Sequence, residues 1–317
     1  SVRIIAGEQV YIDSAVMASG KIEVEGGLAG IDDQGLSVVL GTAGGLTALG
    51  ETTDDSGALV SVIAADEFEL LGWLRAGLNV SQQFNEAGER IGETIHWSDE
   101  SGLLHLAAGG QAYLGGHTVN QQGEAIETGV MLYAKSRIEV IGGESDDGVG
   151  VKMHASTALV VHAADGSIDI RATEDADIQG TLVAGGEITR QFDPTGVDLG
   201  RQIEYFDGDS SVRIEADHQI LLGQTIRAGQ SINLIGGDDP LEPDADDGST
   251  NYSGKGIVLY GSVQLITSRN NSVINLNAPG PLDILAPQYS DELVAQGWIG
   301  TGDGQLTADV SMDIWLD

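Results

Sequence analysis

The feature that most constrains this chain is a repeat of about 105 residues, found three times along its 317 residues. Three passages align with one another and place Gln9, Gln111 and Gln219 in one register. A second match is longer: segment 61–97 aligns with segment 169–205 without a gap, which pairs Gly72 with Gly180. We call this constant shift, which carries Ser61 to Asp169, the repeat offset. The sequence therefore predicts successive copies of one supersecondary unit.

The copies span residues 1–102, 103–210 and 211–317 and account for the whole sequence. We therefore expect one continuous repeat structure without a linker or a foreign domain. The middle copy carries an insertion, HTVNQQGEAIET, at residues 117–128.

Within each copy the apolar residues alternate with polar ones in short runs, as in Val212 and Ile214. Runs with this period of two, broken by glycine, predict short half-buried strands. The 46 glycines, 6 prolines and 5% aromatic content suit many short strands joined by tight turns. We predict an all-β, right-handed parallel β-helix, a β-solenoid, with about four or five coils in each repeat. Tandem β-sandwich domains are the alternative fold.

The passages SIDIRATEDADIQGTLVAGGEIT and VRIEADHQILLGQTIRAGQSINLIGG resemble the repeats of filamentous-haemagglutinin-type adhesins and related giant bacterial surface proteins. In that family, short strands stack into a right-handed β-helix. The resemblance covers most of the chain as a pattern, although the acidity and the regular repeat length depart from the commonest form. It implies a secreted or cell-surface adhesin, biofilm matrix protein or filament.

The net charge of the chain restricts the classes of molecule that it could bind. The 49 acidic residues against 14 Lys and Arg give a formal net charge of −35. Nucleic acid and anionic membrane surfaces would be repelled, and no apolar run is long enough for membrane insertion. Cations are the natural counterpart, unless the acidity serves solubility in a saline environment. The absence of cysteine excludes disulfides and thiolate metal sites.

Paired aspartates beside glycine follow a strand of the form I-x-V-x-G-G in every copy. Carboxylates on bending loops supply the hard oxygen ligands that Ca²⁺ prefers, so these loops predict calcium sites. Solvated turns are the alternative interpretation. The candidates are Asp32, Asp33, Asp146, Asp147, Asp238, Asp239, Asp244, Asp246 and Asp247.

Other clusters favour structure over catalysis. Carboxylates near residue 207 could imitate a polysaccharide-cleaving site, but the same corner recurs one repeat earlier, which indicates a turn. The residues concerned are Glu204, Asp207 and Asp209, with His96, Asp99 and Glu100 as their counterparts. The six histidines share no register, although His154 and His162 could face each other across adjacent strands. We predict no catalytic residue and no cofactor other than Ca²⁺.

Aromatic side chains on a solenoid could stack on sugars, which makes surface glycans a candidate partner. The four tryptophans are Trp73, Trp97, Trp298 and Trp315. Trp97 is equivalent to Tyr205, which predicts a stacking ladder between repeats. The expected function is that of a non-enzymatic extracellular structural protein, and a glycan-binding module is the alternative. Because both ends of the sequence lie in mid-pattern, we expect end-to-end self-association or a longer parent chain.

Overall fold

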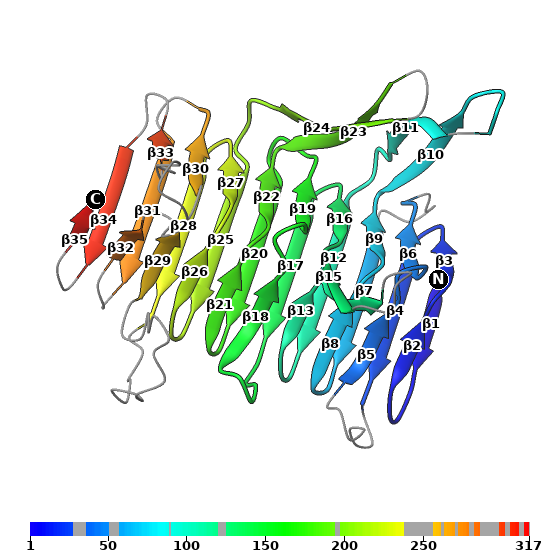
Figure 1. Cartoon of the computed structure of the whole chain (residues 1–317), viewed down its shortest axis with the longest axis horizontal. Helices are drawn as coiled ribbons and strands as arrows, with labels where there is room; N and C mark the ends of the chain where they lie inside the picture. Colours follow the sequence, from blue (N-terminus) through cyan, green and yellow to red (C-terminus); the bar gives the residue numbers. More distant parts are fainter. Residues whose placement is uncertain are drawn as a thin grey trace.

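The structure is a computed structural model, and in the ranges it describes it is all-β, with no helix (Figure 1). Those ranges are 1–27, 36–50, 57–88, 90–119, 125–193, 197–237, 256–260, 263–269, 272–278, 282–285, 298–301, 305–310 and 314–316. Accordingly, no helix long and apolar enough to cross a membrane occurs within them.

The described ranges form three long parallel sheets that run the length of the molecule, with ten, ten and nine strands. Sheet A contains β1 (Val2–Ile5), β4 (Lys21–Gly26), β7 (Ala58–Ala64), β12 (Gly102–Ala108), β17 (Arg137–Gly142), β20 (Ser167–Ala172), β25 (Ser211–Ala216), β28 (Ser231–Gly236), β31 (Val273–Ala278) and β34 (Gln305–Val310). Sheet B contains β2 (Val10–Ile12), β5 (Leu36–Leu40), β8 (Glu67–Leu70), β13 (Ala112–Leu114), β18 (Val149–Met153), β21 (Asp175–Ile178), β26 (Ile220–Leu222), β29 (Ile257–Tyr260), β32 (Leu282–Leu285) and β35 (Ile314–Leu316). Sheet C contains β3 (Ala15–Ala18), β6 (Gly45–Ala48), β9 (Trp73–Ala76), β16 (Met131–Ala134), β19 (Ala158–Val161), β22 (Thr181–Ala184), β27 (Thr225–Ala228), β30 (Gln264–Thr267) and β33 (Trp298–Thr301).

The chain visits sheets A, B and C in turn, and we call one such passage a coil. Each strand pairs in parallel with its counterpart in the next coil, as β17 does with β20. This is the arrangement expected of a parallel β-helix or solenoid, and it differs from the antiparallel pairing of β-sandwiches.

The period-two pattern places one apolar face of each strand in a shared core. In β20, Ile168, Ile170 and Ala172 are buried, whereas the alternate residues point outward. Parallel register stacks equivalent residues, so Ile168 lies between Ile138 and Val212. The result is one aliphatic cluster that draws residues from all three sheets.

The repeat offset corresponds to three coils. The ladder leads from Leu59 in β7 through β12 and β17 to Ser167 in β20. The expectation of four or five coils per repeat was wrong for the first two copies, because hairpins take up part of each, whereas the third copy contributes four strands to sheet A.

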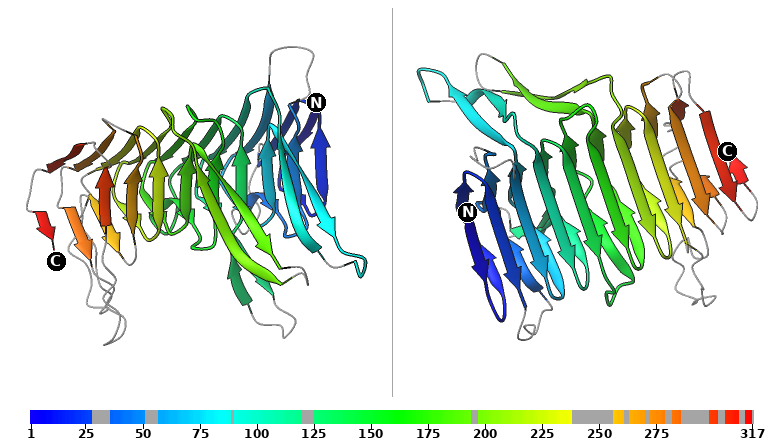
Figure 2. Two further views of the ribbon diagram at one scale, coloured as in Figure 1. Left: turned by 90° about the horizontal axis from the view of Figure 1, so that it is seen from above. Right: turned by 180° about the vertical axis from the view of Figure 1, so that it is seen from behind.

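Within the part of the chain that the structure describes, three antiparallel hairpins project from the sheets (Figures 1 and 2). The first joins β10 (Leu78–Phe84) to β11 (Arg90–Trp97), and the second joins β23 (Gly186–Phe192) to β24 (Asp198–Tyr205). They coincide at the repeat offset and carry the same irregularity, at Phe84 and at Phe192. The third, β14 (Gly116–Val119) with β15 (Ala125–Thr128), is formed by the insertion of the middle copy.

Both of the longer hairpins are preceded by a glycine whose backbone angle φ is positive. Gly77 has a φ of 78° and Gly185 a φ of 75°. Glycine adopts this left-handed conformation without the steric penalty that a Cβ atom brings, which explains why both copies have glycine here.

Two of the three repeated glutamines, Gln9 and Gln111, hydrogen-bond beside bulges. A bulge at Leu36–Val38 in β5 and another at Val149–Val151 in β18 interrupt the ladders of sheet B. Gln9 donates its side-chain Nε2–H to the Leu36 carbonyl at 3.1 Å, and Gln111 donates to the Val149 carbonyl at 3.0 Å. Each amide thus supplies a donor to a carbonyl beside a bulge in the next coil.

Candidate functional site

The outer face of sheet C carries a second apolar cluster, beneath the first two hairpins. Tyr133, Val160 and Val183 form one outward column on β16, β19 and β22, and all three are buried. Apolar residues of the hairpins, among them Ile95 and Ile188, pack against this cluster. Sheet C therefore has apolar side chains on both faces where the hairpins cover it.

The two hairpins meet at a group of side chains that we call the junction cluster: Trp97, Lys135, His162, Glu187 and Phe206. Trp97 and His162 stack with ring centroids 4.1 Å apart, and Phe206 meets the His162 ring edge-on at 4.9 Å. The Trp97 indole donates its Nε1–H to Glu187 Oε2 at 2.8 Å. The cluster therefore connects β11, β23 and the corners that follow β16 and β19.

His162 is held neutral in this cluster. Burial, with the positive charge of Lys135, lowers the pKa of His162 to about 4. Glu187 Oε2 lies 3.4 Å from His162 Nδ1 and favours the charged ring, but burial dominates. A neutral imidazole can stack on an indole without a buried unpaired charge.

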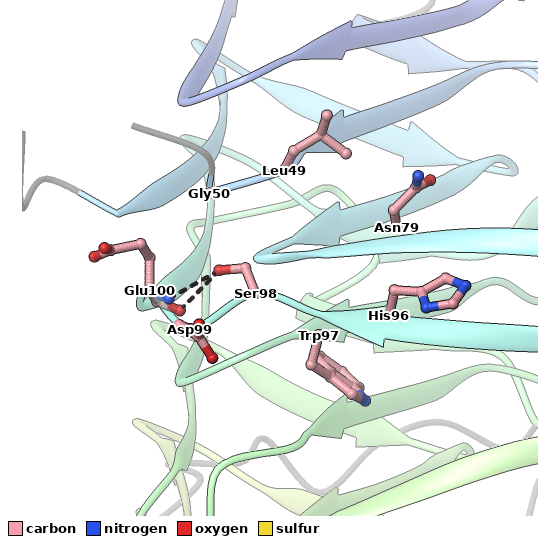
Figure 3. Close-up of a pocket in the computed structure, with 8 residues that line it drawn as sticks. All are labelled: Leu49, Gly50, Asn79, His96, Trp97, Ser98, Asp99 and Glu100. Carbon is pink, nitrogen blue, oxygen red and sulfur yellow. Dashed lines mark hydrogen bonds between the residues drawn. The ribbon is translucent and has the colours of Figure 1, made fainter. Parts of the chain in front are cut away.

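A pocket of about 460 Å³ lies at the base of the first hairpin (Figure 3). It is lined by Leu49, Gly50, Asn79, His96, Trp97, Ser98, Asp99 and Glu100. The Ser98 hydroxyl closes a turn by donating to the Glu100 carbonyl and accepting from the Glu100 N–H. His96 points away from both acids in Figure 3 and hydrogen-bonds to Ser81 Oγ at 2.8 Å. The polar groups of this corner do not converge on one point.

The corresponding corner of the next repeat holds a pocket of about 280 Å³. Asp207 and Asp209 line it together with Asp165, and Arg269 forms an ion pair with Asp209. Glu204 lies on β24 opposite Glu187. The repeat thus places a hollow beside an acidic turn in both copies, the first with two acids and the second with three acids and an arginine.

Of the predicted calcium ligands, the structure describes Asp146 and Asp147. Asp147 accepts hydrogen bonds from Gln111 Nε2 at 2.9 and 3.1 Å, from Ser145 Oγ at 2.9 Å and from the Val149 N–H at 3.1 Å. Burial alone would raise the pKa of Asp147, but these hydrogen bonds and Lys152 together lower it. Asp147 therefore anchors its own loop.

The same corner brings in two acids that the sequence did not single out. Burial, reinforced by the negative charge of Asp146, raises the pKa of Asp66. Burial also raises the pKa of Glu67, with contributions from Asp66, Asp147 and Asp146. Loops from the coils of β7 and β17 therefore place like charges together.

Calcium binding stays a prediction. The described residues contain no group of three His, Cys, Asp or Glu side chains arranged to hold a metal ion. The other candidates fall outside the described residues: Asp32, Asp33, Asp238, Asp239, Asp244, Asp246 and Asp247.

The sequence left a face-to-face arrangement of His154 and His162 open and predicted a ladder of Trp97 and Tyr205, and neither arrangement occurs. His154 and His162 do not face each other, because they flank opposite ends of β19. Trp97 and Tyr205 are not one stacking ladder: Trp97 stacks on His162, whereas the Arg227 guanidinium lies 3.2 Å from the centroid of the Tyr205 ring. Each hairpin meets a different coil, so equivalent rings acquire different partners.

Sequence reasoning did not identify Lys135, Glu187 or Tyr133 as members of a site. A signal was present at Tyr133, because an outward strand position that should be polar carries a large ring.

No family model matches the chain, and neither the curated proteins nor the solved structures contain a match to it.

Proposed function

We propose that this chain is a non-enzymatic structural segment of an extracellular protein, a right-handed parallel β-helix that acts as a stiff spacer in a surface adhesin, biofilm matrix or filament. The observation that supports the proposal best is the continuous ladder of sheet A, in which ten strands pair in parallel from β1 to β34.

Stiffness follows from this ladder. Each interior strand is hydrogen-bonded to a neighbour on both sides, and the aliphatic core continues from coil to coil. Bending such a rod would have to break ladders in several sheets together. The hairpins project outward and leave the stacking order unchanged.

Ion pairs between coils also support a structural role. Sheet A stacks Glu139 on Asp169, and Arg137 bridges the two, with Arg137 Nη2 3.4 Å from Glu139 and 3.6 Å from Asp169. Arg171 Nη2 lies 2.9 Å from Asp169 in addition. Arginines are scarce in this acidic chain, and these two offset like charges that the parallel register would otherwise bring together.

Particle shape is the direct test. Electron microscopy of the purified chain, with Ca²⁺ and then with a chelator, should show rods with an axial rise of about 4.8 Å per coil. Rods or filaments that shorten or disperse on chelation would add calcium to the scaffold role. Particles that lack this axial repeat in both conditions would rule out the spacer.

A matched activity test separates the enzymatic alternative. The chain is incubated with neutral and acidic polysaccharides, and new reducing ends are measured. We expect none above the level of a heat-denatured sample. If the native chain produces new reducing ends and the Asp207→Asn or Asp99→Asn variant does not, the non-enzymatic proposal is contradicted.

A further inference from the structure

The first two hairpins have the same backbone arrangement in both copies, but several side chains in and beside them differ. At the repeat offset the first two hairpins have the same bulge and retain aliphatic residues, such as Ile95 and Ile203. Four nearby positions change completely: Trp73, Arg75, Gln82 and Glu93 correspond to Thr181, Val183, Arg190 and Arg201. Because the backbone is the same in both copies, the side chains at these positions are not required to form it.

The structure gathers these four residues around one pocket of about 400 Å³ between the first hairpin and sheet C. Trp73 and Arg75 come from β9, and Gln82 and Glu93 from the paired strands β10 and β11. The rest of the lining is apolar or glycine: Val80, Ile95, Gly129, Met131, Tyr133 and Ile188. We call this space the hairpin pocket.

The Trp73 side chain is held in place in the hairpin pocket by its contacts. Its indole lies directly against the Cα atom of Gly45 in the preceding coil, where any Cβ atom would collide with the ring. The Arg75 guanidinium stands over the same ring, 5.4 Å from its centroid. The floor is also fixed, because Tyr133 donates its hydroxyl hydrogen to the Ile188 carbonyl at 3.2 Å.

This combination suits a sugar. Indole rings can pack on the C–H groups of a pyranose ring, and amide, carboxylate and guanidinium groups can hydrogen-bond to its hydroxyls. The Gln82 side chain lines the hairpin pocket and is exposed to solvent. Arg75 and Glu93 balance each other in charge, and the net charge of −35 repels polyanions.

We propose that the hairpin pocket binds one or two pyranose units of a neutral glycan. The site goes beyond the spacer function and does not depend on it, since it uses the first hairpin and its neighbouring coils.

The test measures binding of neutral gluco-, manno- and galacto-oligosaccharides by saturation-transfer NMR and titration calorimetry, with a polyuronate as the anionic comparison. Trp73→Thr and Gln82→Arg each introduce the residue of the second copy. We expect a neutral oligosaccharide to bind the native chain, and each variant to weaken that binding about tenfold or more. The polyuronate should not bind.

Trp97→Tyr is the matched control, because it also introduces the second-copy residue but lies outside the hairpin pocket. It should bind like the native chain. Gln82 is exposed, so Gln82→Arg decides the result if circular dichroism shows that Trp73→Thr is unfolded. Absence of neutral-sugar binding tighter than about 10 mM would overturn the proposal, as would native affinity in Gln82→Arg and in folded Trp73→Thr. Particle shape is measured separately, so loss of the sugar site and loss of the rod are distinguishable.

Discussion

Neighbouring residues of the same strand serve two different cores in sheet C. Leu132, Leu159 and Leu182 point inward and join the aliphatic cluster that continues through the coils. One residue further along each strand, the Tyr133 column points outward and is buried under hairpins. Along the same outward column Met17 is 55% exposed, in a coil nearer the N-terminus. The inner core depends on the repeat alone, whereas the outer core depends on the hairpins.

The largest effect is expected from Leu159→Ala in the inner core. Leu159 is fully buried, and its truncation leaves a cavity that should cost about 2–5 kcal/mol of unfolding free energy. Val160→Ala, on the next residue and the opposite face, should cost roughly 1–2 kcal/mol. Denaturant unfolding of both variants measures the difference, and equal losses would contradict the distinction between the cores.

A smaller effect is expected where the first hairpin leaves the sheet. Gly77→Ala forces a side chain into a positive φ, and its Cβ would lie 2.8 Å from Lys135 Cβ. We expect a loss of roughly 1–3 kcal/mol and faster hydrogen exchange in residues 78–97.

Gly88→Ala is the control for backbone strain, because Gly88 has a φ of 80° but nothing within 4 Å of an added Cβ. It should cost about 1 kcal/mol or less and leave exchange in β11 unchanged. If both variants behave alike, the contact at Gly77 is irrelevant to hairpin docking.

The junction cluster should make the outer core sensitive to acid. His162 has a pKa of about 4 in the fold, against about 6.5 in the unfolded chain, so the unfolded chain binds the proton first as pH falls. Stability from this group should be constant above pH 6.5 and decline between about pH 6.5 and 4. Denaturation at several pH values compares the native chain with His162→Gln, which should show a shallower decline; parallel curves would exclude His162 as the cause.

The smallest effect is expected at the corner of Glu67, remote from both faces of sheet C. Burial and neighbouring acids raise the pKa of Glu67, so its charged form is disfavoured in the fold above the unfolded pKa. Glu67→Gln should stabilise the chain slightly at pH 7, and the gain should vanish as the pH falls below the unfolded pKa near 4.3 or as salt is added. A gain that is insensitive to pH and salt would point to packing instead.

The sequence predicted the strands well because burial in a sheet imposes a period of two, seen in Ile168 and Ile170. It also revealed the insertion at residues 117–128, since that stretch has no counterpart in the other copies. It did not reveal the hairpin from Leu78 to Trp97, because both matching copies contain it and its strands alternate as the core strands do. Alternation reports which face is buried, not whether the partner strand is parallel. The coil count was therefore too high for the first two copies, whereas the third copy contributes four strands to sheet A.

The candidate sites were harder to predict. Pairs of aspartates identified the corner of Asp147, but Asp66 and Glu67 reach it from another coil, and only the stacking of coils brings them together. The hairpin pocket could not be predicted because Trp73 and Gln82 lie on different strands, and no sequence pattern indicates that these strands form one pocket. Differences between the two copies mark its lining, whereas the search for similarity directed attention to the positions that the copies share.

The gapless repeat offset gives this chain a simple way to change its length. A genetic crossover between equivalent points of segments 61–97 and 169–205 would delete or duplicate three whole coils. The new neighbours would meet in register, since Leu59 and Ser167 occupy the same column of sheet A, three coils apart. Unequal recombination could therefore produce longer and shorter versions of the chain in which the ladder of sheet A stays in register.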